Sequence, residues 1–107
     1  MTTITREHLE LAAKAAGYEL DWETDVPNRV HPFRGGLKNY EPWQPHEDPF
    51  DSWLLAADCF MQIDFADSSV KVWIDGGPKV INFGSTAGIT AMEAVTLAAA
   101  EIGRAMG

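Results

Sequence analysis

Three short alternating segments within Met61–Phe83 constrain the fold of this chain more than any other feature. Apolar and polar residues alternate in each segment, and a period of two residues is typical of a strand with one buried face. Gly76 and Gly77 at the second turn permit the positive φ angles that tight hairpins need. We therefore expect a three-strand antiparallel meander whose apolar face is covered by helices. The residues predicted to face the core are Met61, Ile63, Phe65, Val70, Val72, Ile74, Ile81 and Phe83.

Three other segments carry the start and stop signals of helices. The first has Thr5 as a capping residue and Gly17 as a stop, and the second begins with Asp48 followed by a proline. The third begins with Thr90 and Glu93, which match a capping box. The predicted helices cover about residues 6–16, 49–59 and 91–105.

The second and third predicted helices each have an apolar stripe at helical spacing, and we expect both stripes to be buried. In the second helix the stripe consists of Trp53, Leu54, Ala57 and Phe60, broadened by Leu55 and Cys59. In the third helix it consists of Met92, Val95, Thr96, Ala99, Ile102 and Met106.

Residues 18–43 form a second region with strand character. Tyr18, Leu20 and Trp22 alternate with acidic residues, which predicts a half-buried strand. The following prolines confine later strands to an edge, and Val30–Phe33 with Leu37–Trp43 could pair as a hairpin. Residues 1–107 are thus predicted to form a single α+β domain, an antiparallel sheet packed by about three helices.

The chain of 107 residues has a formal net charge of −8 and a sequence pI of about 4.6. Such a charge disfavours nucleic acid as a partner and steers the protein toward basic surfaces. Cys59 is the single cysteine, which rules out an intrachain disulfide and favours a reducing compartment. With no secretory signal and no long apolar run, we expect a soluble cytoplasmic protein without membrane contact.

The sequence predicts neither an enzyme, a metal site nor a cofactor. His8, His31, His46 and Cys59 do not have the spacing of known metal-binding motifs. A buried, inert thiol is favoured over a nucleophile at Cys59, since no base accompanies it. The glycine-rich segment Gly84–Gly88 precedes a helix, but a plain connection is favoured over an anion site.

One loop is a candidate for binding an anionic small molecule. It places basic and aromatic residues around a glycine pair, which suits a phosphorylated ligand such as a nucleotide. A solvated hairpin with ordinary surface charges is the favoured alternative. The candidate ligand-binding residues are Arg29, His31, Arg34, Lys38, Tyr40 and Trp43.

A second set of residues is a candidate for binding a protein partner. Glu41, Glu47, Asp48 and Asp51 form an acidic group before and within the second predicted helix. Trp73 falls on the face of its strand that should be polar. Either a helix covers that outer face too, or Trp73 marks an interface.

Three blocks of the chain together resemble small bacteriophage proteins that carry the phage ABA sandwich domain. The blocks are Ile4–Tyr18 with Trp22, then Trp43-Gln44-Pro45 with Asp48, Asp51, Ser52 and Leu55-Ala56, and last Ala98–Met106. The chain departs from that pattern at Gln44, where the family usually has Asn or Asp, and in the insert Arg29–Lys38. The resemblance implies an accessory protein of a phage or prophage in a bacterial cytoplasm, and it implies no active site.

These observations leave four hypotheses, in order of preference, and an enzyme is the last of them. The first is a small acidic phage protein that binds and blocks a host protein, as part of counter-defence. The second is a protein that sequesters a nucleotide signal through the Arg29–Lys38 loop. The third is RNA binding, because Asp48–Met106 has the helix–three strands–helix order of double-stranded RNA-binding domains. Such domains need basic residues at the start of the last helix, and Thr90–Glu93 has none.

The charge balance predicts that duplex RNA and DNA bind weakly. At a net charge of −8 and without a basic stripe, little counterion release can drive association. We expect no gel shift of either duplex below about 1 μM protein at about 150 mM salt. A clear shift under those conditions would place RNA binding above protein binding.

Overall fold

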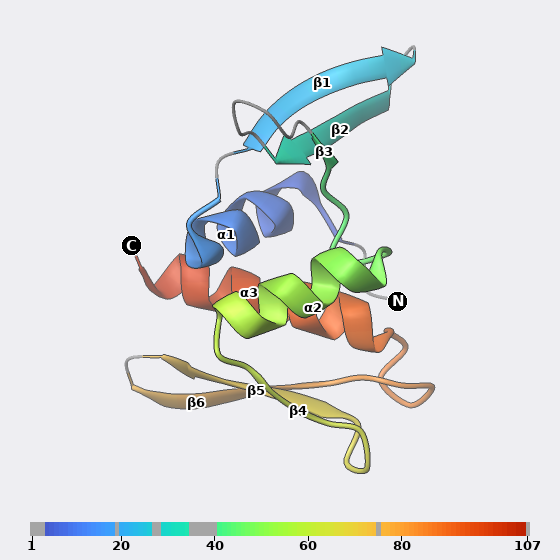
Figure 1. The fold of residues 1–107 in the computed structure, drawn as a ribbon. Helices are drawn as coiled ribbons and strands as arrows, with labels where there is room; N and C mark the ends of the chain where they lie inside the picture. The colour runs from blue at the N-terminus through green and yellow to red at the C-terminus, as the bar shows by residue number, and fades with distance from the viewer. Residues whose placement is uncertain (1–3, 19, 27–28, 35–40, 75, 107) are drawn as a thin grey trace.

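The computed structural model describes residues 4–18, 20–26, 29–34, 41–74 and 76–106 of the chain. Within this part, two small antiparallel sheets lie on opposite sides of a layer of helices (Figure 1). The architecture is α+β with three described helices, as the sequence predicts. In chain order the elements are α1 (Arg6–Ala16), β1 (Leu20–Val26), β2 (Arg29–Arg34), β3 (Glu41–Pro42), α2 (Pro49–Asp58), β4 (Gln62–Asp64), β5 (Ser69–Ile74), β6 (Gly77–Asn82) and α3 (Ala91–Ala105).

The predicted meander is the sheet with strand order β4-β5-β6. Val70 on β5 pairs with Ile63 on one side and with Ile81 on the other, so these three side chains share one face. Gly76 and Gly77 have φ angles of 102° and 121°, the left-handed region that the turn was predicted to need. Strand β6 begins at Gly77, two residues earlier than the predicted run at Lys79.

The other sheet has the order β1-β2-β3. Strand β1 confirms the strand expected from the alternation around Leu20 and Trp22. Strands β2 and β3 pair at Phe33–Pro42 and Arg34–Glu41, a shorter form of the hairpin that the sequence suggested. Strands β1 and β2 also pair as a hairpin, which the sequence pattern did not predict.

Side-chain caps fix the ends of the helices. In α1, Thr5 Oγ1 accepts a hydrogen bond from the His8 backbone N–H, and His8 Nδ1 accepts one from the Thr5 N–H. Histidine thus takes the place that Glu or Gln usually has in a capping box. In α3, Thr90 and Glu93 form the predicted box, with distances of 2.9 and 3.1 Å.

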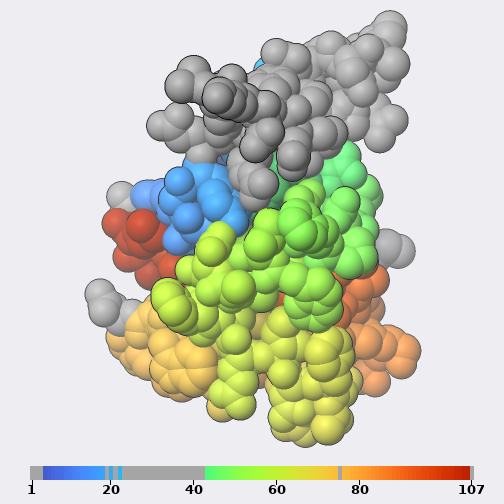
Figure 2. Space-filling view, in the orientation of Figure 1, coloured from blue at the N-terminus to red at the C-terminus, as the bar shows by residue number. Residues whose placement is uncertain are grey.

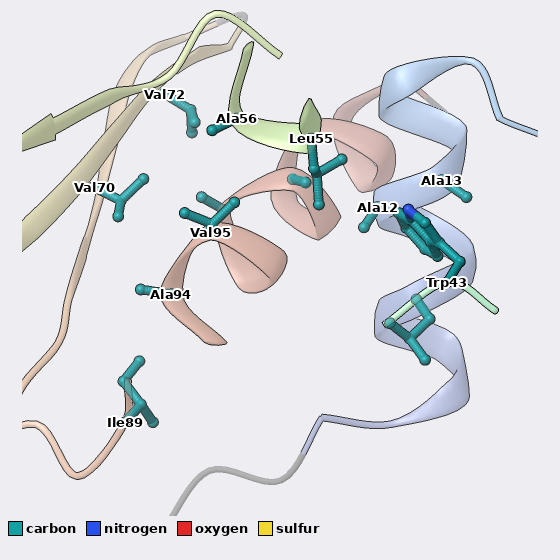
Figure 3. Packing of buried hydrophobic residues seen from close by; sticks show 13 residues of the cluster. Ala12, Ala13, Trp43, Leu55, Ala56, Val70, Val72, Ile89, Ala94 and Val95 are labelled. Atoms are coloured by element: carbon teal, nitrogen blue, oxygen red, sulfur yellow. The ribbon is translucent and has the colours of Figure 1, made fainter. Parts of the chain in front are cut away.

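Helix α3 is the centre of the core (Figure 3). Val70 and Val72 on β5 point toward Ala94 and Val95 on one side of the helix. On the far side of the core, the Trp43 ring lies against α1, where it is 1% exposed. The buried residues of α3 are Ala94, Val95, Thr96, Ala98, Ala99, Ala100 and Gly103. Several of these are alanines because α3 has neighbours on more than one side, and small side chains permit close approach.

Helices α1 and α3 approach each other closely at Gly103. A Cβ atom added at Gly103 would lie 2.0 Å from the carbonyl oxygen of Leu11 and 2.7 Å from its carbonyl carbon. Both atoms belong to the backbone of α1, so neither can move without shifting that helix. Gly103 therefore sets the distance between the two helices.

The predicted orientation of α2 is wrong in part. Trp53, Ala57 and Phe60 were expected in the core but face solvent. The buried face of α2 consists of Asp51, Ser52, Leu55 and Ala56. This face packs better because small side chains let α2 approach α3, and because the Asp51 carboxylate has a backbone partner there.

Two further residues expected in the core are also exposed. Phe65 is 61% exposed, because β4 ends at Asp64 and the chain turns away from the sheet at this point. Met106 is 57% exposed, because it follows the last residue of α3. Both errors come from extending a periodic pattern past the end of its element.

The substitution Gly103→Ala should destabilise the protein. Helix propensity alone would favour alanine by about 1 kcal/mol, but the clash with Leu11 should outweigh it and give a net loss of about 1–3 kcal/mol. Urea denaturation measures the change. Ala105→Gly in the exposed last turn reports the propensity effect without the clash. A Gly103→Ala variant more stable than the wild type would contradict this packing.

Candidate functional site

Four exposed aromatic side chains on and beside α2 form the most distinctive surface feature among the described residues. We call this set the α2 aromatic surface: Phe50, Trp53, Phe60 and Phe65, which are 65%, 47%, 85% and 61% exposed. Helix α2 crosses the front of the molecule in Figure 2, where no other described element covers it. Exposed aromatic groups of this kind are typical of binding surfaces.

Ring contacts connect this surface to the β4-β5-β6 sheet. The Trp53 and Phe65 rings meet edge to face, with centroids 6.0 Å apart. Phe65 in turn contacts Phe83 in a similar geometry, also at 6.0 Å. Aromatic side chains from the helix and from the turn after β4 thus form one continuous group.

The loop before α2 holds the N-terminal end of this helix in place. Asp48 Oδ1 accepts hydrogen bonds from the backbone N–H groups of Phe50 and Asp51, which makes Asp48 the predicted N-cap. Asp51 Oδ2 accepts a hydrogen bond of 3.0 Å from the Gln44 N–H. The Gln44 carbonyl accepts from the N–H groups of Glu47 and Asp48. The exposed face of α2 is therefore presented from a fixed position.

An unusual residue, Phe60, follows the C-cap of α2. The Phe60 N–H donates to the Ala57 carbonyl and the Met61 N–H to the Ala56 carbonyl, the two bonds of a Schellman motif. The residue after the C-cap in this motif is usually glycine, because its φ angle is positive. Here it is Phe60, with φ of 54°. A bulky residue in the left-handed region is a strained arrangement.

The α2 aromatic surface lies in the most acidic part of the chain. Residues 39–70 contain seven of the sixteen acidic residues and none of the eight Lys and Arg residues. The exposed acidic residues before, within and after α2 are Glu47, Asp48, Asp58, Asp64 and Asp67. Basic groups on a partner would therefore meet acidic groups around the aromatic side chains.

Of the predicted ligand-binding residues, only Trp43 has a side chain within the described part of the structure. Trp43 is buried in the core, with its ring edge-on to Tyr18 at 5.7 Å, so it cannot stack on a base. Arg29, His31 and Arg34 lie on β2, and their side chains are outside the described part of the structure. Lys38 and Tyr40 are likewise outside the described residues.

The predicted partner-binding residues separate into two groups. Glu47 and Asp48 are exposed at the start of α2, whereas Asp51 is 7% exposed and holds the preceding loop. Asp51 is therefore not part of the accessible surface. Glu41 lies on β3, and its side chain is outside the described part.

Trp73 is 56% exposed, together with Val80 at 49%. The described helices lie on the other side of the β4-β5-β6 sheet (Figure 1). Within the described residues, no helix covers the outer face of this sheet, where Trp73 lies. The outer face of this sheet is a second, smaller exposed surface.

The glycine-rich segment before α3 lines a pocket of about 410 Å³ with Asp67, Ser68, Asn82 and Phe83. Two of its amide groups are used within the loop, since Gly84 donates to the Ile89 carbonyl and Gly88 to the Gly84 carbonyl. No basic residue is among those that line this pocket in the described structure. This favours the plain strand-to-helix connection over an anion site.

Two groups with shifted pKa values lie near α2. Burial raises the pKa of the Cys59 thiol to about 11, and Asp58 adds to the increase. The thiol is protonated at neutral pH, as expected for an inert cysteine. Burial lowers the pKa of His46, against the opposing effect of Glu47 and Glu93. Among the described residues, no cluster of His, Cys, Asp and Glu could hold a metal ion.

Comparison of the chain with protein-family models, with curated proteins and with solved structures gives no match. In the part of the chain described, no helix combines the length and apolar character that a transmembrane span needs.

His46 should make stability depend on pH. Its Nδ1 is buried and has no hydrogen-bond partner among the described residues, which favours the neutral ring. The unfolded chain takes up a proton near pH 6.5, whereas folded His46 resists it, so the free energy of unfolding should fall as pH decreases below about 6.5. Urea denaturation at several pH values measures this slope. In His46→Gln the slope over the same range should be smaller, and an unchanged slope would contradict the prediction.

Proposed function

We propose that the protein is a binding module that docks onto a basic surface of a partner protein through the α2 aromatic surface. The observation that carries the proposal is the exposure of Phe50, Trp53, Phe60 and Phe65 within a segment that has no Lys or Arg. Aromatic side chains are enriched at the centres of protein interfaces.

The aromatic side chains and the acidic groups of this surface contribute to binding in different ways. Burial of the aromatic side chains supplies affinity, because each removes a large apolar area from water. The acidic groups supply specificity and a faster association, and this effect weakens with salt. A partner with an apolar patch among Lys and Arg residues fits both parts.

The resemblance to phage proteins supports one version of this proposal. In it, the partner is a protein of the bacterial host, and binding blocks that protein as part of counter-defence.

Affinity capture from a bacterial lysate should identify a partner that depends on the α2 aromatic surface. Phe50→Ala/Trp53→Ala should lose the captured protein, since hot-spot truncations weaken binding by about 30-fold or more. Glu47→Lys/Asp67→Lys should slow its association and reduce the salt dependence. This pair leaves the helix cap at Asp48 intact. The measurements are mass spectrometry of the eluate and surface plasmon resonance with the identified protein.

Three controls distinguish this surface from the alternatives. Trp73→Ala removes a similarly exposed tryptophan from the sheet face, and Glu7→Lys/Glu10→Lys makes the same charge change on α1. Both should retain the partner. Arg29→Ala/Arg34→Ala tests the ligand hypothesis. Capture that is identical for every variant, or loss of a phosphorylated small molecule with the arginine variant alone, would overturn the proposal.

A further inference from the structure

Three residues of α2 have the spacing of a helix-pairing seam, and an exposed phenylalanine stands at its end. Phe50, Trp53 and Ala57 follow one another on α2 at intervals of three and four residues, and Phe60 lies just past the end of the helix. This is the spacing of the a and d positions of a heptad, through which one helix packs against another. All four are exposed, whereas Leu55 and Ala56 on the opposite side are buried. Helix α2 thus packs against its own protein with one face and presents a second packing face to solvent.

The strain at Phe60 marks one end of this seam. A glycine at this position would satisfy the Schellman motif without the penalty of a left-handed phenylalanine. The ring is 85% exposed, so it gains little from burial within its own chain. Strain that the fold does not need is evidence for a role outside the fold.

We propose that the α2 aromatic surface binds a basic amphipathic helix of a partner protein, with Phe60 as the anchor at the end of the seam. This inference rests on the proposed function and names the kind of element that is bound. Phe50 to Ala57 spans about 10 Å along α2, and Phe60 lies beyond the end of the helix, so about two to three turns of the partner helix fit along the surface. Its Lys and Arg residues flank an apolar stripe and meet the acidic groups around α2.

Charge decides between this occupant and a second copy of the chain. A second copy would bring another acidic segment against the first, and residues 39–70 have no Lys or Arg to offset the repulsion. A basic helix has the complementary charge. Its apolar stripe can bury the exposed rings in a geometry of the knobs-into-holes type.

The test uses a fluorescent synthetic peptide of about four helical turns, with Leu at the a and d positions and Lys at the flanking positions. A peptide with Glu in place of each Lys is the charge control. Anisotropy should show that wild-type protein binds the Lys peptide and not the Glu peptide. Binding should weaken in about 1 M salt, where screening is strong.

Two variants of Phe60 separate binding from stability. Phe60→Gly removes both the ring and the strain, so its Tm should rise by about 4–8 °C, while its affinity for the Lys peptide falls by about 30-fold. Phe60→Ala removes the ring but keeps a Cβ atom at a residue with positive φ. It should therefore lose affinity for the Lys peptide without the rise in Tm expected for Phe60→Gly. Phe50→Ala should also weaken binding, and Trp73→Ala should not.

Each contrary outcome has a distinct meaning. If Phe60→Gly binds the peptide as well as the wild type, Phe60 is not an anchor and the inference is wrong, while lysate capture still decides the proposed function. Equal binding of the Lys and Glu peptides would exclude a preference for a basic helix. Light scattering that shows a dimer, dissociated by Phe60→Gly, would assign the surface to a second copy instead.

Discussion

The backbone of α3 approaches that of α1 so closely at Gly103 that no side chain fits against the Leu11 carbonyl. The rest of the helical layer depends on this distance. Helix α3 contacts α1, α2, β5 and β6, and it does so with alanines on several sides. Helix α2 also packs on α3 with mostly small residues. Its inner face consists of Ser52, Leu55 and Ala56 beside Asp51. The large aromatic side chains of α2 then have no place inside the protein.

Much of the fold could be predicted because local signals agree with one another. The caps at Thr5, Asp48 and Thr90 define where the helices begin, and each is confirmed by a side-chain hydrogen bond. The meander could be predicted because its alternating pattern and its glycine turn indicate the same structure. Strand β6 begins earlier than predicted, since pairing with β5 extends to the turn itself at Gly77.

The orientation of α2 could not be predicted in the same way. Its sequence is apolar over most of its circumference, so periodicity alone does not say which face is buried. The deciding information is tertiary: the space beside α3 and the Gln44 N–H that the Asp51 carboxylate bonds. The available signal was the polar pair Asp51 and Ser52 at the start of an otherwise apolar helix. Helix-start electrostatics offered a simpler explanation for Asp51. The α2 aromatic surface was missed for the same reason.

The concentration of charge in residues 39–70 has a consequence for how the molecule moves before any contact. Outside this segment, acidic and basic residues nearly balance, so almost all of the net charge belongs to one part of the chain. Such a molecule carries a permanent electric dipole. An external field exerts a torque on this dipole, while the net negative charge is drawn toward a positive body. Near a positively charged body, rotational diffusion is biased so that α2 turns toward that body. The orientation of an encounter is therefore partly set while the two surfaces are still separated by water.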